Sequence, residues 1–127
     1  MEFRKQQSIF LQIGDYIYDN ILMKKWQAGD RIPSIRELAV DVEVNPNTVM
    51  RAYAYLQERG VIYNQRGIGY FIADQAYENT RQLKLKDFIK HELSRLYKTL
   101  DLLGLKLEDL ADLHQKHTED STGEETA

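Results

Sequence analysis

One stretch of the chain, NPNTVMRAYAYLQERG at residues 45–60, carries side chains suited to hydrogen-bonded recognition. The amide of Asn47 can form two hydrogen bonds with adenine, and the guanidinium of Arg51 can form two with guanine. The hydroxyl of Thr48 can reach a base edge or a phosphate. If one helix presents these groups together, their chemistry is the recognition of base edges in a major groove.

The sequence predicts that such a helix exists and gives both of its ends. Asn45 is a favoured N-cap residue, Pro46 fits the first helical position, and Gly60 is the expected residue after the end. Apolar residues recur at helical spacing and predict a buried face: Val49, Ala52, Tyr53 and Leu56. At 100° per residue, the opposite face carries Asn47, Arg51, Ala54 and Glu58. On an isolated helix, the favoured interpretation of these polar groups would be ordinary first-turn residues and a solvated charge.

Two helices are expected before residue 45. An amphipathic helix is predicted over about residues 8–25 from its apolar series. A shorter helix begins after Pro33, where Ser34 and Glu37 form a capping box. The turn that separates this short helix from the one at 45 is three or four residues long, which is typical of a helix-turn-helix.

After Gly60 the apolar period changes to two. Strands are predicted at 61–65 and 70–73, joined by a hairpin turn at 66–69, RGIG. Helix, helix, helix and hairpin is the order of a winged helix. The predicted fold class is therefore mainly α with a small β-hairpin wing, followed by a C-terminal helical segment.

Further candidate contacts lie outside the third helix. Ser34 and Arg36 begin the second helix, where hydroxyl, backbone N–H and guanidinium can hold a phosphate. Arg36 can equally pair with a nearby acid. Arg66 and Gly67 at the wing tip can enter a minor groove, or they form a plain hairpin turn that carries a charge.

Charge and composition leave room for a nucleic-acid partner. The formal net charge is −3, but residues 1–73 hold nine Lys/Arg against eight Asp/Glu, whereas residues 74–127 hold eight against twelve. Whole-chain charge therefore says little about any one face. The chain has no cysteine, no signal peptide and no apolar run long enough to cross a bilayer, so a cytoplasmic protein without membrane association is expected.

The residues from 75 onward predict a helical dimerisation tail. Apolar residues step by 4, 3, 4 and 3, the spacing of a coiled-coil seam: Ile89, Leu93, Leu96, Leu100 and Leu103. Such a stripe needs a partner, and a second copy of the chain is favoured over folding back on the first helix. Three parts follow: a winged helix at 1–74, the tail at 75–117 and a disordered acidic end at 118–127.

The stretch AGDRIPSIRELAVDVEVNPNTVMRAYAYLQERGVIYNQRGIGYFI at 28–72 resembles the DNA-binding domain of GntR-type bacterial transcription regulators. The short tail is similar to that of the YtrA-like subgroup. The resemblance implies a homodimeric regulator, a repressor in our interpretation, that binds double-stranded DNA at a palindromic operator. Matched residue by residue, it implies these DNA contacts: Ser34, Arg36, Asn45, Asn47, Thr48, Arg51, Arg66 and Gly67. Many members have a basic residue where this chain has Met50, so either Met50 or Arg51 occupies the base-reading position.

Other function classes have weaker support in the sequence. His114 and His117 beside Asp112 lack a third metal ligand, and RGIGYF is not a phosphate-binding loop, so no metal, no cofactor and no enzyme activity are expected. A winged helix that binds protein instead of DNA is the alternative, but it predicts an apolar or acidic outward face at 47–55. A small-molecule effector, if the protein has one, would need a crevice between the winged helix and the tail.

Overall fold

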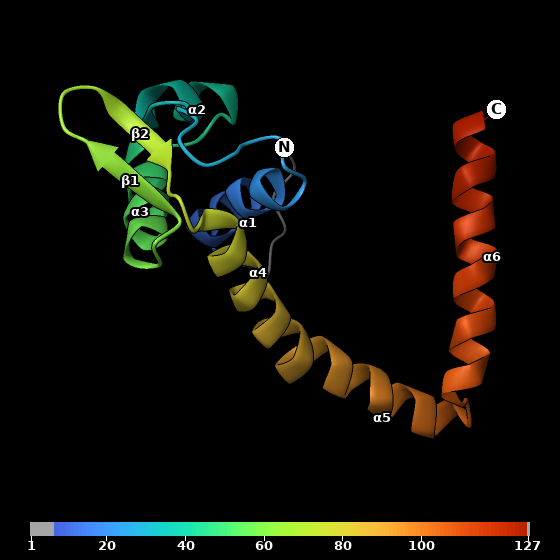
Figure 1. The fold of residues 1–127 in the computed structure, drawn as a ribbon. Helices are drawn as coiled ribbons and strands as arrows, with labels where there is room; N and C mark the ends of the chain where they lie inside the picture. The colour runs from blue at the N-terminus through green and yellow to red at the C-terminus, as the bar shows by residue number, and fades with distance from the viewer. Residues whose placement is uncertain (1–6, 127) are drawn as a thin grey trace. The chain divides into compact units, whose positions relative to one another are not determined.

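The computed structural model describes residues 7–126 and confirms the predicted fold class (Figure 1). Helices and strands follow one another in this order: α1 (Ile9–Leu22), α2 (Ile35–Asp41), α3 (Pro46–Glu58), β1 (Ile62–Gln65), β2 (Gly69–Ile72), α4 (Ala76–Asp87), the π-helical turn η1 (Phe88–Leu93), α5 (Ser94–Leu103) and α6 (Leu107–Thr126). The chain forms two compact units, residues 1–85 and 86–127.

The core of the first unit lies between α1 and α3 and under the hairpin. All four residues predicted for the buried face of α3 are inaccessible to solvent: Val49, Ala52, Tyr53 and Leu56. They pack with Ile13, Ile17 and Ile21 of α1 and with Leu38 of α2. Helical spacing of apolar residues therefore located the core-facing side of each helix, because side chains three and four apart share one face.

The hairpin is antiparallel, with Ile62 opposite Ile72 and Gln65 opposite Gly69. A segment before α2 runs along its other edge. The backbone N–H of Ile32 donates to the carbonyl of Tyr70 at 3.0 Å, and the N–H of Ile72 donates to the carbonyl of Asp30 at 2.9 Å. This segment holds β2 from the side, so a hairpin that would be marginal alone is fixed to the helical core.

The first unit extends beyond the predicted boundary at residue 74. Ala76 and Thr80 of α4 are buried, and the Nδ2 of Asn79 donates to the carbonyl of Gly60 at 3.2 Å. The Nζ of Lys84 pairs with the Oδ1 of Asp15 on α1 at 2.7 Å. Small residues four apart let α4 approach the core closely, and the unit ends only at Leu85.

The tail is not one uninterrupted α-helix. Residues 88–93 form η1, and the Oγ of Ser94 donates to the carbonyl of Ile89, five residues earlier, at 3.3 Å. A π-turn shifts side chains around the axis relative to an α-helix. Ile89 and Leu93 therefore lie in η1 rather than on one regular α-helical stripe with Leu96, Leu100 and Leu103.

Helix α5 ends at Gly104, whose φ of 69° is left-handed, as expected for a glycine at a helix end. Helix α6 spans Leu107–Thr126, and the disorder expected from residue 118 stays a prediction. Within α6, the Oγ1 of Thr118 donates to the carbonyl of His114 at 3.0 Å, and the Oγ1 of Thr122 to that of Thr118 at 2.9 Å. Within residues 7–126, no helix is both long and apolar enough to span a membrane.

Candidate nucleic-acid interface

Two helix starts contribute most of the predicted contacts, and in both a side-chain oxygen caps the helix. The Oδ1 of Asn45 accepts from the N–H of Asn47 at 2.8 Å, and the Oγ of Ser34 accepts from the N–H of Glu37 at 3.1 Å. These oxygens satisfy backbone donors that would otherwise lack a partner. Each cap residue still has a hydrogen-bond donor for an outside partner: the hydroxyl proton of Ser34 and the side-chain NH₂ of Asn45.

The loop before α2 is tied to α3 by a buried phenol. The hydroxyl of Tyr53 donates to the backbone carbonyl of Pro33, the residue before the N-cap Ser34. Burial raises the pKa of Tyr53, which keeps this donor protonated. The ring of Tyr53 also meets Tyr70 of β2 edge-to-face, with centroids 4.8 Å apart. One side chain of α3 thus fixes the start of α2 and touches the hairpin.

The variant Tyr53→Phe should lower the free energy of unfolding by about 1–2 kcal/mol, because it leaves the Pro33 carbonyl without its partner. Urea denaturation measures the change. The matched control is Tyr63→Phe on β1, a residue that is 42% exposed and whose loss of a hydroxyl should be nearly neutral. Equal stabilities for the two variants would show that the Tyr53 hydroxyl does not fix the loop.

Arg51 lies on the exposed side of α3, but its guanidinium is not extended into solvent. It lies over the ring of Phe10 on α1, with 4.4 Å between its central carbon and the ring centroid. Phe10 in turn meets Tyr55 edge-to-face at 5.9 Å. Met50, the neighbouring candidate, is 51% exposed. Both positions are accessible, and a cation–π contact already restricts where the Arg51 fork points.

Asn47 and Thr48 occupy the first turn of α3. The Asn47 side chain is exposed, and its carboxamide forms no hydrogen bond with another described residue. Thr48 is half-buried, and its backbone N–H donates to the carbonyl of Asn45 at 2.9 Å. The whole side-chain amide of Asn47 is therefore accessible for recognition, whereas the side chain of Thr48 is only partly accessible.

The wing tip is an exposed turn at residues 66–68. Gly67 has φ of 79°, a conformation that favours glycine, and a Cβ added there would meet no atom within 4 Å. The side chain of Arg66 is exposed beside it. The turn is closed by a hydrogen bond from the N–H of Ile68 to the carbonyl of Gln65 at 2.9 Å. At Gly67 the backbone itself can therefore approach another surface closely, between the exposed side chains of Arg66 and Ile68.

Arg31 was not among the predicted contacts, although it lies within the GDRIPS segment. Its backbone forms an isolated antiparallel β-bridge with Phe71 of β2. Its side chain lies close to Gly69, because a Cβ added at that glycine would be only 3.0 Å from the Arg31 Nε. The guanidinium thus lies against the start of β2. The signal available in the sequence was its position between the turn at Gly29 and Pro33, but only strand pairing shows that it borders the wing.

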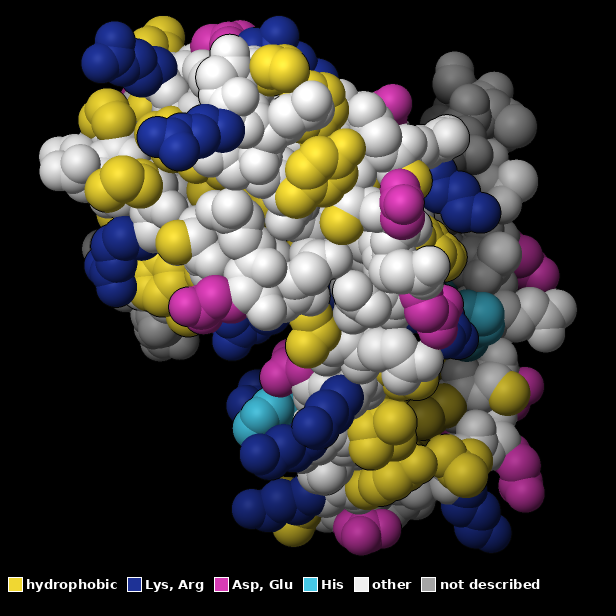
Figure 2. Space-filling view, turned by 60° about the vertical axis from the view of Figure 1, so that its left-hand side comes forward, with side chains coloured by type: hydrophobic (Ala, Val, Ile, Leu, Met, Phe, Trp, Pro, Cys, Tyr) yellow, Lys and Arg dark blue, Asp and Glu magenta, His cyan; other side chains and the backbone are white. Residues whose placement is uncertain are grey.

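Several arginines of the first unit are available to an anionic partner. Within residues 7–126, no carboxylate forms an ion pair with any of these four: Arg31, Arg36, Arg51 and Arg66. The sequence left open whether Arg36 pairs with an acid, and it forms no ion pair with any acid among residues 7–126. In Figure 2, basic side chains are spread over the winged-helix unit in the upper part of the view.

No group of three or more potential metal ligands occurs among the residues that the structure describes. His114 and His117 are exposed residues of α6. Both of them lie with Asp112 on a single helix, and the part of the chain that the structure describes brings no further ligand to them.

Comparison with known proteins identifies the family. The family model for bacterial regulatory proteins of the gntR family matches residues 10–72. The uncharacterized HTH-type transcriptional regulator YhcF of Bacillus subtilis (strain 168) is 36% identical over 93% of this chain and 96% of its own length. This chain belongs to the GntR family.

Members similar over the whole length place the chain in the YtrA-like subgroup. The HTH-type transcriptional repressor YtrA of Bacillus subtilis (strain 168) is 32% identical over 94% of this chain and 92% of its own length. A GntR family transcriptional regulator from Listeria monocytogenes has a similar structure, with a TM-score of 0.75, 34% identity and coverage of 90% of this chain and 98% of its own. As a GntR protein, the chain is a DNA-binding transcription regulator and not an enzyme.

Proposed function

We propose that this GntR protein is a cytoplasmic repressor that binds a palindromic operator as a homodimer, with α3 in the major groove. The observation that carries the proposal is the outward face of α3. Opposite a fully buried apolar face, it presents the free amide of Asn47 and the guanidinium of Arg51. In helix-turn-helix proteins, the N-terminal residues of the second helix of the motif contact base edges.

The proposed DNA contacts fall into three groups: base, phosphate and minor-groove contacts. Asn47 and Arg51, with Thr48 or Met50 beside them, read bases. Ser34 and Arg36 at the start of α2 hold a phosphate, and so does the free side-chain NH₂ of Asn45. These phosphate contacts position α3 on the duplex without reading its sequence. Arg66 and Gly67 carry the wing to the adjacent minor groove, and Arg31 holds the base of the wing in place. Repression is supported by the similarity to YtrA, a transcriptional repressor of nearly the same length.

The tail supplies the dimer in this proposal. Leu96, Leu102, Leu103 and Leu107 are all exposed in the second unit, whereas Leu100 is buried within it. An apolar surface on a monomer is unfavourable in water, and burial against a second copy removes it. A two-fold dimer presents two copies of α3 and therefore matches a palindromic site.

The experiment that tests the proposal begins with selection of duplexes from a random pool, followed by gel shifts on the recovered operator over a salt series. The operator complex should weaken roughly 10³-fold between 50 and 200 mM salt if about six phosphates are neutralised. The variant Arg36→Ala should lower the slope of log K against log salt by about two, because the homodimer neutralises one phosphate fewer in each of its two half-sites. Arg81→Ala, an exposed arginine of α4, is the matched control with an unchanged slope.

The outcome also separates the alternative, a winged helix that binds protein. That alternative predicts that no duplex is enriched and that any residual binding is the same for all sequences. The exposed Asn47 and the unpaired Arg36 argue against it, because such a docking face would be apolar or acidic. Failure to enrich any duplex at moderate salt would contradict the proposed function.

A further inference from the structure

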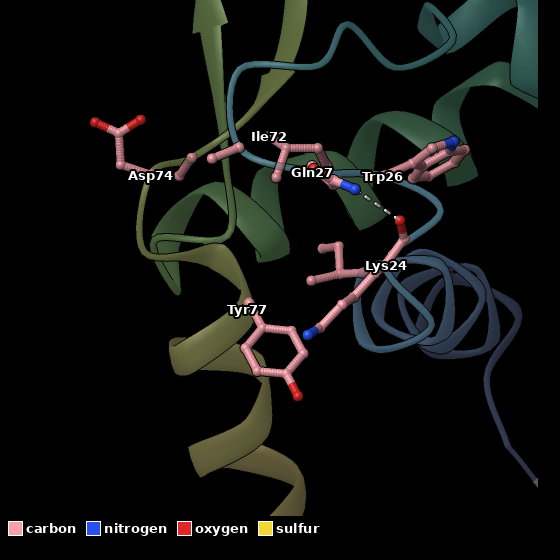
Figure 3. A pocket seen from close by; sticks show the side chains of 9 residues that line it. Lys24, Trp26, Gln27, Ile72, Asp74 and Tyr77 are labelled. Atoms are coloured by element: carbon pink, nitrogen blue, oxygen red, sulfur yellow. Dashed lines mark hydrogen bonds between the residues drawn. The ribbon is translucent and has the colours of Figure 1, made fainter.

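A hollow of about 290 Å³ lies in the first unit, where α1 ends, β2 ends and α4 begins (Figure 3). Buried Ile21 and Ile72 form its floor, and Tyr77 and Trp26 are among the other residues that line it. Its volume is near the lower limit of small-molecule sites, about 300–1,000 Å³. None of the proposed DNA contacts lines it, so the proposed function leaves this feature unexplained.

Lys24 supplies the positive charge of this hollow. Its Nζ lies 5.2 Å from the centroid of the Tyr77 ring, and within residues 7–126 no carboxylate forms an ion pair with it. Asp74 also lines the hollow, but its carboxylate points away from Lys24 in Figure 3. An ammonium group that lies on an aromatic ring beside an apolar floor can still form a charge-assisted hydrogen bond with an incoming anion.

The backbone at Lys24 is a second, independent feature of this residue. Its φ of 60° is left-handed, and it follows the end of α1 at the position where glycine is usual. A lysine there is less stable than a glycine. Glu43 has the same conformation after α2, so the backbone alone does not mark a site. At Lys24, the unfavourable conformation coincides with an unpaired ammonium that lines a hollow.

We propose that the hollow binds a small aromatic carboxylate, with the carboxylate on the Nζ of Lys24 and the ring against Tyr77 and the Ile21–Ile72 floor. The hollow is too small for a macromolecular segment, and its charge and aromatic lining match this class of ligand. Because the end of β2 and the first turn of α4 both line it, an occupant contacts the base of the wing. Any effect on DNA affinity rests on the proposed function, whereas binding itself does not.

The test uses the fluorescence of Trp26, the single tryptophan of the chain, which lines the hollow. Benzoate and 2-hydroxybenzoate are titrated against the full chain without DNA, and benzamide serves as the uncharged isostere. The carboxylates should change the emission saturably, and benzamide should bind about tenfold more weakly because it lacks the charge that pairs with Lys24. An emission change that never saturates, or equal affinity for benzamide and benzoate, would overturn the proposal.

Lys24→Gly is the decisive variant, because it removes the ammonium and suits the left-handed backbone. It should lose about tenfold or more in benzoate affinity while its melting temperature stays the same or rises. The matched control is Lys25→Ala, the adjacent exposed lysine that does not line the hollow, and its affinity should equal that of the parent. Parental affinity in Lys24→Gly would refute the site. Saturable benzoate binding by a chain that prefers no duplex would refute the DNA proposal alone.

Discussion

The double variant Leu96→Glu, Leu103→Glu should sediment as a monomer where the parent chain sediments as a dimer. The two leucines are 37% and 67% exposed, so glutamate at these positions does not disturb the core of the second unit. In a dimer, however, the carboxylates would be buried in an apolar contact without partners, which is strongly unfavourable. Leu100 is the wrong choice for this test, because it is already buried within its own unit.

DNA affinity should fall with the loss of the dimer. A dimer holds its second winged helix near the second half-site, and this linkage is typically worth about 10²–10⁴ in affinity without any new contact. Gel shifts on the selected operator measure the fall, and an isolated half-site should show little difference between variant and parent. The control is Met23→Glu, the same change at an exposed apolar residue of the first unit. An unchanged sedimenting mass in the double variant would contradict dimerisation through this stripe.

The variant Arg51→Ala should reduce discrimination between the selected operator and a scrambled duplex by about 1–3 kcal/mol, the range of a bidentate base contact. The measured quantity is the ratio of the two dissociation constants at one salt concentration. To reach a base, the guanidinium must leave the ring of Phe10, where it lies 4.4 Å from the centroid. The net effect is therefore expected in the lower half of that range, since giving up the cation–π interaction offsets part of the energy of the base contact.

Two further variants test whether Arg51 reads a base through its planar guanidinium and whether Met50 contributes to base reading. Arg51→Lys keeps the charge but not the planar fork, so it should retain affinity for scrambled DNA and still lose discrimination. Met50→Ala tests the neighbouring candidate for the base-reading position, and we expect a smaller loss of discrimination. If Arg51→Ala weakens the operator and scrambled complexes equally, Arg51 contacts phosphate and does not read a base.

Helix α3 could be predicted from neighbouring residues alone. The cap at Asn45, the proline at Pro46 and the glycine at Gly60 act on the backbone within one turn, so they settle where α3 begins and ends. The buried face of α3 was equally predictable, because helical periodicity is a local property. The winged-helix order followed from the change of apolar period after Gly60.

Long-range packing, by contrast, determines where the side chains of Arg31, Arg51 and Tyr53 lie and where the boundary between the two units falls. Arg51 on Phe10, Tyr53 on Pro33 and Arg31 against β2 join residues far apart in the chain, so no local pattern predicts them. The first turns of α4 belong to the winged-helix unit because Ala76 and Thr80 fit its surface. The hollow at Lys24 arises in the same way, from two chain segments, residues 21–28 and 72–77, that meet only after folding.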